Sequence, residues 1–148
     1  MTPPLGEHFP EEYRKKFCQD HLKPGAVLRF QSFQTSPPKI KRCVVIALND
    51  ESVSLALTYI NSGKPSNPYL QPWQLYFECE GREYLDHDSH LDCAQLYEEN
   101  FEVISRMIMR DITVYLGRMS DEDFLKVRGL VELAKSIPFK LKKKYGFV

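Results

Sequence analysis

The sequence lacks the features that mark membrane-bound, secreted or redox-active proteins. No apolar run approaches the roughly 20 residues that a membrane-spanning helix needs, so we expect no membrane insertion. The N-terminal stretch MTPPLGEHFPEEYRKKF has no apolar core of the signal-peptide type, which favours a cytoplasmic location. No two cysteines stand at C-x-x-C spacing, which argues against a zinc site or a redox motif and favours free thiols. The four cysteines are Cys18, Cys43, Cys79 and Cys93.

Familiar catalytic motifs are also missing. There is no glycine-rich phosphate loop, no G-x-S-x-G turn and no H-E-x-x-H helix. The segment DHDSHLD, from Asp86 to Asp92, places His87 and His90 among acids, as a metal site or an acid–base pair would. The spacing of these residues does not match a structural zinc site with four protein ligands. Asp-x-Asp loops are more often turns whose carboxylates accept hydrogen bonds from backbone N–H groups. We therefore expect neither a metal nor a cofactor.

The composition is that of one soluble globular domain. The chain has 148 residues, 43% of them hydrophobic and 12% aromatic, which is enough to bury a core without disulfides. No repeat or long linker divides it. We expect a barrel core with its last helix over residues 24–135, an N-terminal helical extension over residues 1–23, and a basic tail over residues 136–148.

Charge is balanced overall but unevenly distributed. The formal net charge is zero. Between His21 and Asn49 there are five cations and no acid, whereas the segment from Tyr76 to Glu102 has nine acids against the single Arg82. The last ten residues carry four lysines and no acid. This polarity predicts one basic and one acidic face, although each run alone is typical of an ordinary solvated surface.

Alternating or wholly apolar runs bordered by turn residues predict a mainly β protein with helical ends, an α+β fold built on a small barrel. Helices are expected over Pro10–Asp20, over Glu98–Arg110, and from a Ser120 cap to about Lys135. The expected strands are Ala26–Phe33, Cys43–Leu48, Val53–Ile60, Trp73–Cys79 and Ile112–Leu116, with a shorter strand at Glu83–Leu85 and an extended segment at His90–Tyr97.

The stretch SPPKIKRCVVIAL joins a cationic segment directly to the apolar run that starts at Cys43. If this strand and the next form a hairpin, the start of one lies beside the end of the other. Cations, a hydroxyl and an amide would then converge at one end of the sheet. Such a group could bind a phosphodiester, because cations neutralise its charge and the hydroxyl and amide position its oxygens. The converging residues are Lys41, Arg42, Asn61, Ser62 and Lys64, with Lys39 close by in sequence.

Aromatic residues follow this cluster in the sequence. Trp73, Tyr69 and Tyr59 are candidates for stacking bases, although aromatic residues are more often part of a core or its rim.

The order of these segments resembles the MazF/PemK-like toxins, small SH3-like barrels that cut RNA in bacterial toxin–antitoxin systems. The resemblance covers most of the chain from Pro24 to Leu133. It implies a metal-independent endoribonuclease that cleaves single-stranded RNA, forms a homodimer and binds a cognate antitoxin protein. The similar segments are PGAVLRF, KRCVVIAL, LALTYINS, LDHDSHLDCAQL and YLGRMSDEDFLKVRGLVEL.

The resemblance also implies which residues act. The family's catalytic arginine matches Arg42 by identity, or Lys41 when counted back from the apolar run, and its hydroxyl residue matches Ser62, with Asn61 in the competing register. Here Cys43 stands where the family has a proline. Lys39, Asn61, Lys64 and Trp73 are the expected substrate-binding residues. The alternative is a non-catalytic barrel that binds nucleic acid or an acidic partner protein.

Overall fold

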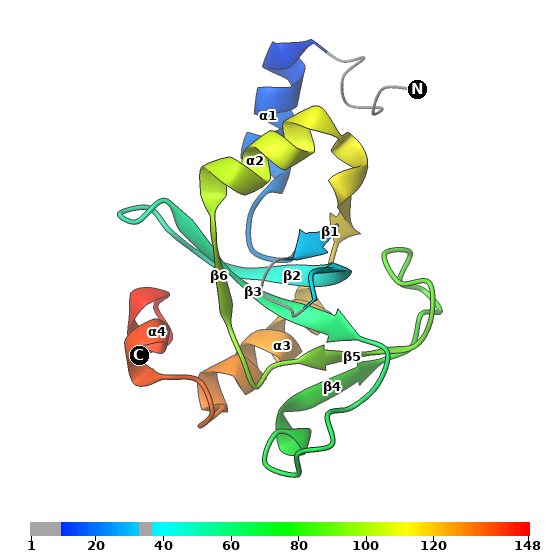
Figure 1. Ribbon diagram of the computed structural model, residues 1–148, viewed down its shortest axis with the longest axis vertical. Coiled ribbons are helices and arrows are strands. Elements are labelled where there is room, and N and C mark those ends of the chain that lie inside the picture. Colours follow the sequence, from blue (N-terminus) through cyan, green and yellow to red (C-terminus); the bar gives the residue numbers. More distant parts are fainter. Residues whose placement is uncertain (1–9, 33–36) are drawn as a thin grey trace.

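A computed structural model describes residues 10–32 and 37–148. Its fold is α+β, a curled antiparallel sheet that forms half of a small barrel, with helices at both ends of the chain (Figure 1). The predicted fold class is therefore confirmed. In chain order the elements are α1 (Glu11–His21), β1 (Ala26–Ser32), β2 (Lys39–Asn49), β3 (Ser54–Asn61), the 3-10 turn η2 (Gln71–Trp73), β4 (Gln74–Phe77), β5 (Ser89–Asp92), β6 (Tyr97–Asn100), α2 (Phe101–Arg110), the 3-10 turn η3 (Ile112–Val114), β7 (Tyr115–Arg118), α3 (Asp121–Leu133) and α4 (Phe139–Lys144).

The sheet is built around the β2–β3 hairpin. Its strands run in the order β4-β5-β3-β2-β1-β7, and β6 pairs with β3 in addition. The run Cys43–Leu48 lies within β2, between two neighbouring strands, and Cys43 to Ala47 are buried as predicted. An apolar run with no charge suits this position because both of its faces are covered.

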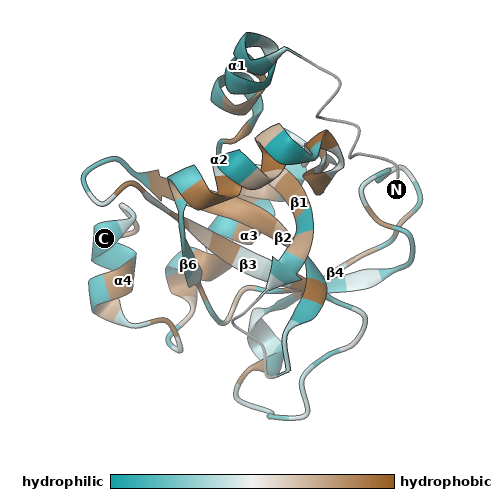
Figure 2. Ribbon diagram, turned by 45° about the horizontal axis from the view of Figure 1, so that its top comes forward, coloured by the Kyte–Doolittle hydropathy of each residue, from teal (hydrophilic) through white to brown (hydrophobic). Residues whose placement is uncertain are grey.

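Each face of the sheet packs against its own helices (Figure 1). Side chains alternate along a strand, so neighbouring residues contribute to different cores. On one face, which we call the α2 face, Leu28 and Cys43 pack with Ile104 of α2. On the other, the α3 face, Val44 and Ile60 pack with residues of α3 such as Val127. Figure 2 shows the hydrophobic colouring concentrated on the central strands, whereas α1 is mainly hydrophilic.

A β-bulge interrupts the pairing of β2 with β3. Val45 pairs with Leu57 and Ala47 pairs with Ala56, which leaves Ile46 as the extra residue. Ile46 and Ala47 both contribute to the core on the α3 face. The alternation of side chains is therefore shifted by one residue across the bulge.

Several predicted boundaries are wrong, each for a local reason. Residues 98–100 were expected to be helical but belong to β6, because pairing with β3 holds them extended and Asn100 caps α2 by accepting from Val103 N at 3.0 Å. The expected strand Glu83–Leu85 is a turn in which Leu85 N donates to the Arg82 carbonyl oxygen at 3.0 Å, directly after Gly81 with φ +78°. The first half of the expected strand Ile112–Leu116 is the 3-10 turn η3, capped by Asp111.

Other predicted strands are shortened at their ends. Val53 has φ +50° and belongs to the hairpin turn, so β3 begins at Ser54. Of the run Trp73–Cys79 only Gln74–Phe77 is strand. Phe33, the last residue of the expected first strand, lies outside the described residues.

The C-terminal helices complete the core. Ser120 caps α3 as predicted, with its Oγ accepting from Asp123 N at 3.2 Å, but the helix ends at Leu133 rather than Lys135. Residues 136–148, which were expected to be a basic tail, contain α4 and bury Tyr145 and Phe147 against the α3-face core. Among the described residues, no helix is both long enough and apolar enough to span a bilayer.

Candidate functional site

The start of β2 and the end of β3 lie side by side, as the hairpin hypothesis requires. Arg42 pairs with Ile60, and Lys41 Nζ donates a hydrogen bond to Asn61 Oδ1. We call this end of the sheet the rim. Pairing fixes the backbone, so the polar groups at the rim are carried by rigid strands.

The predicted single cluster does not form, because Lys41 and Arg42 point to opposite faces of the sheet. The Lys41 ammonium lies on the α2 face, 5.6 Å from the centroid of the Tyr59 ring. Arg42 lies on the α3 face, next to Ile60. Consecutive residues of a strand alternate in this way, and the cations belong to β2 itself, which starts at Lys39 rather than at Cys43.

Lys41 is tied into a polar network on the α2 face. Partial burial and the nearby Lys39 lower the pKa of its ammonium, and Asp92 acts in the opposite direction. The Tyr59 ring beneath the ammonium is itself buried and packs against Tyr97, with centroids 4.4 Å apart. Tyr59 is therefore not free to stack a base, and Lys41 and Asn61 mainly hold each other.

Arg42 lines a cavity of about 140 Å³ on the α3 face, which we call the Arg42 pocket. Its Nη1 lies 3.3 Å from Asp86 Oδ1, and its Nε is buried without a hydrogen-bond partner. A buried donor that lacks an acceptor is costly, so the guanidinium retains capacity for an oxygen ligand. The pocket is lined by Ile40, Lys41, Arg42, Ile60, His87 and Ser89.

A second arginine lies directly across the strands from Arg42. Arg29 of β1 is the register partner of Arg42 and is exposed. Residues directly opposite each other share a face, and their Cβ atoms lie about 4.5–5.5 Å apart. Like charges at this spacing repel, and the Asp86 carboxylate beside Arg42 offsets part of that repulsion. Arg29 was missed as a site residue because its register with β2 cannot be read from the sequence.

His87 brings acid–base chemistry to the same pocket. Its Nδ1 lies 2.9 Å from the Asp88 carbonyl oxygen and 3.1 Å from Ser89 Oγ, while Nε2 lies 3.5 Å from Asp86 Oδ1. A proton on Nδ1 satisfies the carbonyl oxygen and leaves Nε2 able to accept one. The DHDSH segment signalled this role in the sequence, but not its position beside Arg42.

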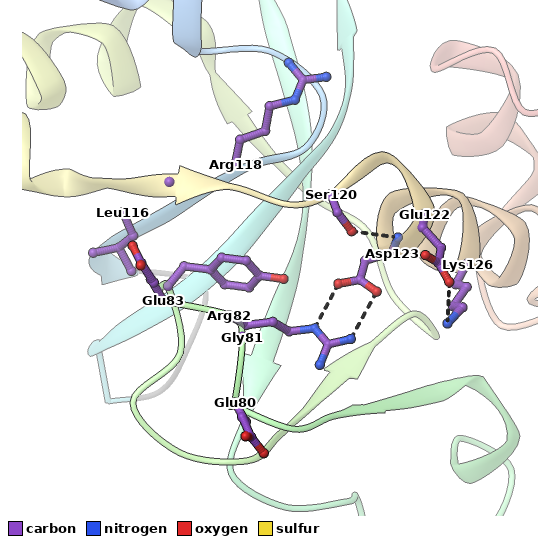
Figure 3. A pocket seen from close by; sticks show the side chains of 12 residues that line it. Glu80, Gly81, Arg82, Glu83, Leu116, Arg118, Ser120, Glu122, Asp123 and Lys126 are labelled. Atoms are coloured by element: carbon purple, nitrogen blue, oxygen red, sulfur yellow. Dashed lines mark hydrogen bonds and ion pairs between the residues drawn. The ribbon is translucent and has the colours of Figure 1, made fainter.

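An ion pair anchors the loop that carries His87 (Figure 3). Arg82 Nε and Nη2 donate to the two carboxylate oxygens of Asp123 on α3, at 2.8 and 3.1 Å, and Nη1 donates to the Glu78 carbonyl oxygen at 2.8 Å. The hydrogen bond from Arg82 lowers the pKa of Asp123, and the same bond raises the pKa of Arg82. The pair borders an open cavity of about 560 Å³ between this loop, β7 and α3.

The remaining predicted residues are dispersed. Lys39 is exposed at the start of β2, and Ser62 and Lys64 are exposed in the loop that follows β3. Trp73 is half-buried, packs against the α3-face core and lines a different cavity. Among residues 10–32 and 37–148, no group of three or more His, Cys, Asp or Glu side chains is placed to hold a metal ion.

Comparison with protein-family models and with curated proteins gives no match for this chain. The site must be interpreted from its own chemistry.

Proposed function

We propose that the protein is a metal-independent endoribonuclease that cleaves single-stranded RNA, in the manner of the PemK/MazF-like toxins. The observation that carries the proposal is the cross-strand pair of Arg29 and Arg42 beside the imidazole of His87. Two guanidinium groups suit the oxygens of a phosphodiester, and a neighbouring imidazole suits proton transfer.

The RNA itself supplies the nucleophile in this mechanism. Its 2′-hydroxyl attacks the adjacent phosphorus, and the proton passes to Nε2 of His87. A P–O2′ bond forms and the P–O5′ bond breaks, giving a 2′,3′-cyclic phosphate. The leaving 5′-oxygen takes a proton from water to become a hydroxyl, and His87 returns its proton to the solvent. Arg42, with Arg29 beside it, stabilises the charge that grows on the phosphoryl oxygens.

Arg42 must exchange one partner for another during this reaction. Its Nη1 faces Asp86 across 3.3 Å, and that carboxylate is itself 61% exposed. The Arg42 side chain is 25% exposed, so the pair is partly open to solvent and a phosphate can compete with Asp86 for the guanidinium. Lys41 acts indirectly by holding Asn61, and the exposed Lys39, Ser62 and Lys64 would meet the RNA backbone outside the Arg42 pocket.

The test is cleavage of a long single-stranded RNA by purified protein, with and without EDTA. Arg42→Ala and His87→Ala should each lower the rate by on the order of a hundredfold or more. Lys41→Ala and Ser62→Ala should retain more activity, because the Lys41 ammonium is held by Asn61 and Ser62 does not line the Arg42 pocket. Cleavage that EDTA abolishes, or that both Arg42→Ala and His87→Ala retain, refutes the mechanism.

A second function is favoured by the same Asp86 contact. If that carboxylate keeps Arg42 occupied, the rim is a non-catalytic module that binds nucleic acid or an acidic partner segment. Salt-sensitive RNA binding without cleavage would support this function. For either function we propose action in the cytoplasm as a homodimer, and for the toxin a cognate antitoxin protein as partner.

A further inference from the structure

A cavity of about 430 Å³ lies where the loop after β3 meets the segment after α3. We call it the Tyr69–Trp73 pocket. Its walls are mainly aromatic, aliphatic and proline side chains with one lysine at the edge, so it suits a flat apolar group that carries a nearby negative charge. The lining residues are Pro68, Tyr69, Leu70, Pro72, Trp73, Lys135 and Ser136.

The loop presents Tyr69 to solvent on a fixed backbone. Tyr69 is 83% exposed, yet its N–H donates to Asn67 Oδ1 at 3.0 Å. The Leu70 carbonyl oxygen accepts from Trp73 N and from Gln74 Nε2, each at 3.2 Å. The backbone of a loop ordered in this way has already lost most of its conformational freedom. The entropic cost of ordering the loop when a ligand stacks on Tyr69 is therefore small.

The two segments that form the pocket carry no acidic residue. Residues 61–77 include Lys64, and residues 133–148 include Lys135 and four further lysines, without one Asp or Glu in either stretch. Of these lysines, Lys144 pairs with Glu98 and Lys142 donates to the Glu132 carbonyl oxygen, whereas Lys135 lines the pocket itself. Aromatic side chains beside a lysine are typical of surfaces that bind single-stranded nucleic acid, where bases stack and phosphates meet lysine.

The pocket and the Arg42 pocket lie on the same face of the sheet. Trp73 and Ile60 belong to one core cluster, on the α3 face. Trp73 immediately precedes β4, and Phe77 at the other end of β4 pairs with Ser89, which lines the Arg42 pocket. Four residues of extended strand span about 13 Å. A polymer of several nucleotides is therefore long enough to occupy both pockets.

We propose that the Tyr69–Trp73 pocket is a nucleobase subsite that stacks one base of the RNA strand whose phosphodiester lies at Arg42, with Lys135 facing a phosphate. The inference rests on the proposed function and adds to it a second point of contact. Pro68 and Pro72 have no backbone N–H, so the pocket offers few donors to a peptide strand, whereas base stacking needs none.

The chain provides its own reporter for this subsite, because Trp73 is its single tryptophan. The probe is a 2′-O-methyl RNA of about eight nucleotides, a usual site size for single strands, which lacks the attacking hydroxyl and stays intact. Titration should quench tryptophan fluorescence with saturation. Tyr69→Ala should weaken the binding by about tenfold or more. The matched control Tyr13→Ala, which removes a half-exposed tyrosine from α1, should leave it unchanged.

Three results would overturn the subsite: no saturable quenching by the RNA, equal affinity of Tyr69→Ala and the unaltered chain, or quenching by an acidic peptide with one aromatic residue but not by the RNA. The last result would assign the pocket to a protein partner. Failure of the proposed function is a different result. If RNA quenches Trp73 fluorescence but its 2′-hydroxyl form is never cleaved, the proposed nuclease activity is refuted and the subsite is supported. If RNA is cleaved without quenching, the subsite alone is refuted.

Discussion

Replacing Arg29 with glutamine should raise the stability of the protein and lower its affinity for RNA. Arg29 of β1 lies directly opposite Arg42 of β2, and glutamine removes its charge while keeping a shorter, polar side chain. Relief of a like-charge pair at this position is worth about 0.2–1 kcal/mol. In a chain of 148 residues that corresponds to a rise in Tm of about 1–4 °C. Arg42 keeps its contact with Asp86 in the variant.

Thermal unfolding followed by circular dichroism measures the gain, at low and at high salt. The gain should shrink as salt rises, because Arg29 is exposed and its charge is screened. RNA affinity is measured over the same salt series. If Arg29 meets a phosphate, the slope of log affinity against log salt should fall in magnitude by about 0.7 in the variant.

Arg106→Gln is the matched control, since Arg106 is exposed on α2, over the other face of the sheet. It makes the same change of charge and should alter neither Tm nor the salt slope. A lower Tm for Arg29→Gln would show that the two arginines do not repel in the folded state. Unchanged RNA affinity would show that they do not form the phosphate site.

Three further predictions concern the scaffold. Phe147→Ala should cost about 3–5 kcal/mol of unfolding free energy because Phe147 is buried, whereas Phe139→Ala, at a 67% exposed position, should change little; urea titrations measure both. Asp123→Asn should destabilise the protein in neutral buffer. Because Arg82 lowers the folded pKa of Asp123, the pair stabilises fully above about pH 4 and its contribution is lost as pH falls through the lowered pKa, so the urea midpoints of variant and unaltered chain should converge in acid. Burial raises the pKa of the Cys43 thiol, so iodoacetamide should modify it only after unfolding, as mass spectrometry can show; native labelling of Cys43 would contradict its burial.

The central hairpin was predictable because its signals are local. One apolar run begins at Cys43 and the next ends at Ile60, and the turn residues Asn49-Asp50-Glu51 lie between them. Turn residues between two such runs favour antiparallel pairing. Residues 98–100 were not predictable, because Glu98 and Glu99 suit a helix and only the long-range pairing with β3 makes them a strand.

The candidate site was predictable only in part. The approach of Lys41 to Asn61 follows from the hairpin, but starting the strand at Cys43 placed the cations in a loop and concealed their alternation. The position of Arg29 depends on the register of β1 with β2, and that of His87 depends on the ion pair between Arg82 and Asp123. Contacts between residues so far apart in sequence leave no local pattern.

The bulge at Ile46 has a consequence for the core. The extra residue lets Ile46 and Ala47 both face the α3-face core, while β2 stays paired with β3 on either side of the bulge. Deleting Ile46 would make Val45 and Ala47 neighbours in a regular ladder, with Arg42 still opposite Ile60 and Lys41 still beside Asn61. The bulge therefore adds a side chain to the core without changing the chemistry that the edge of the sheet offers to a ligand.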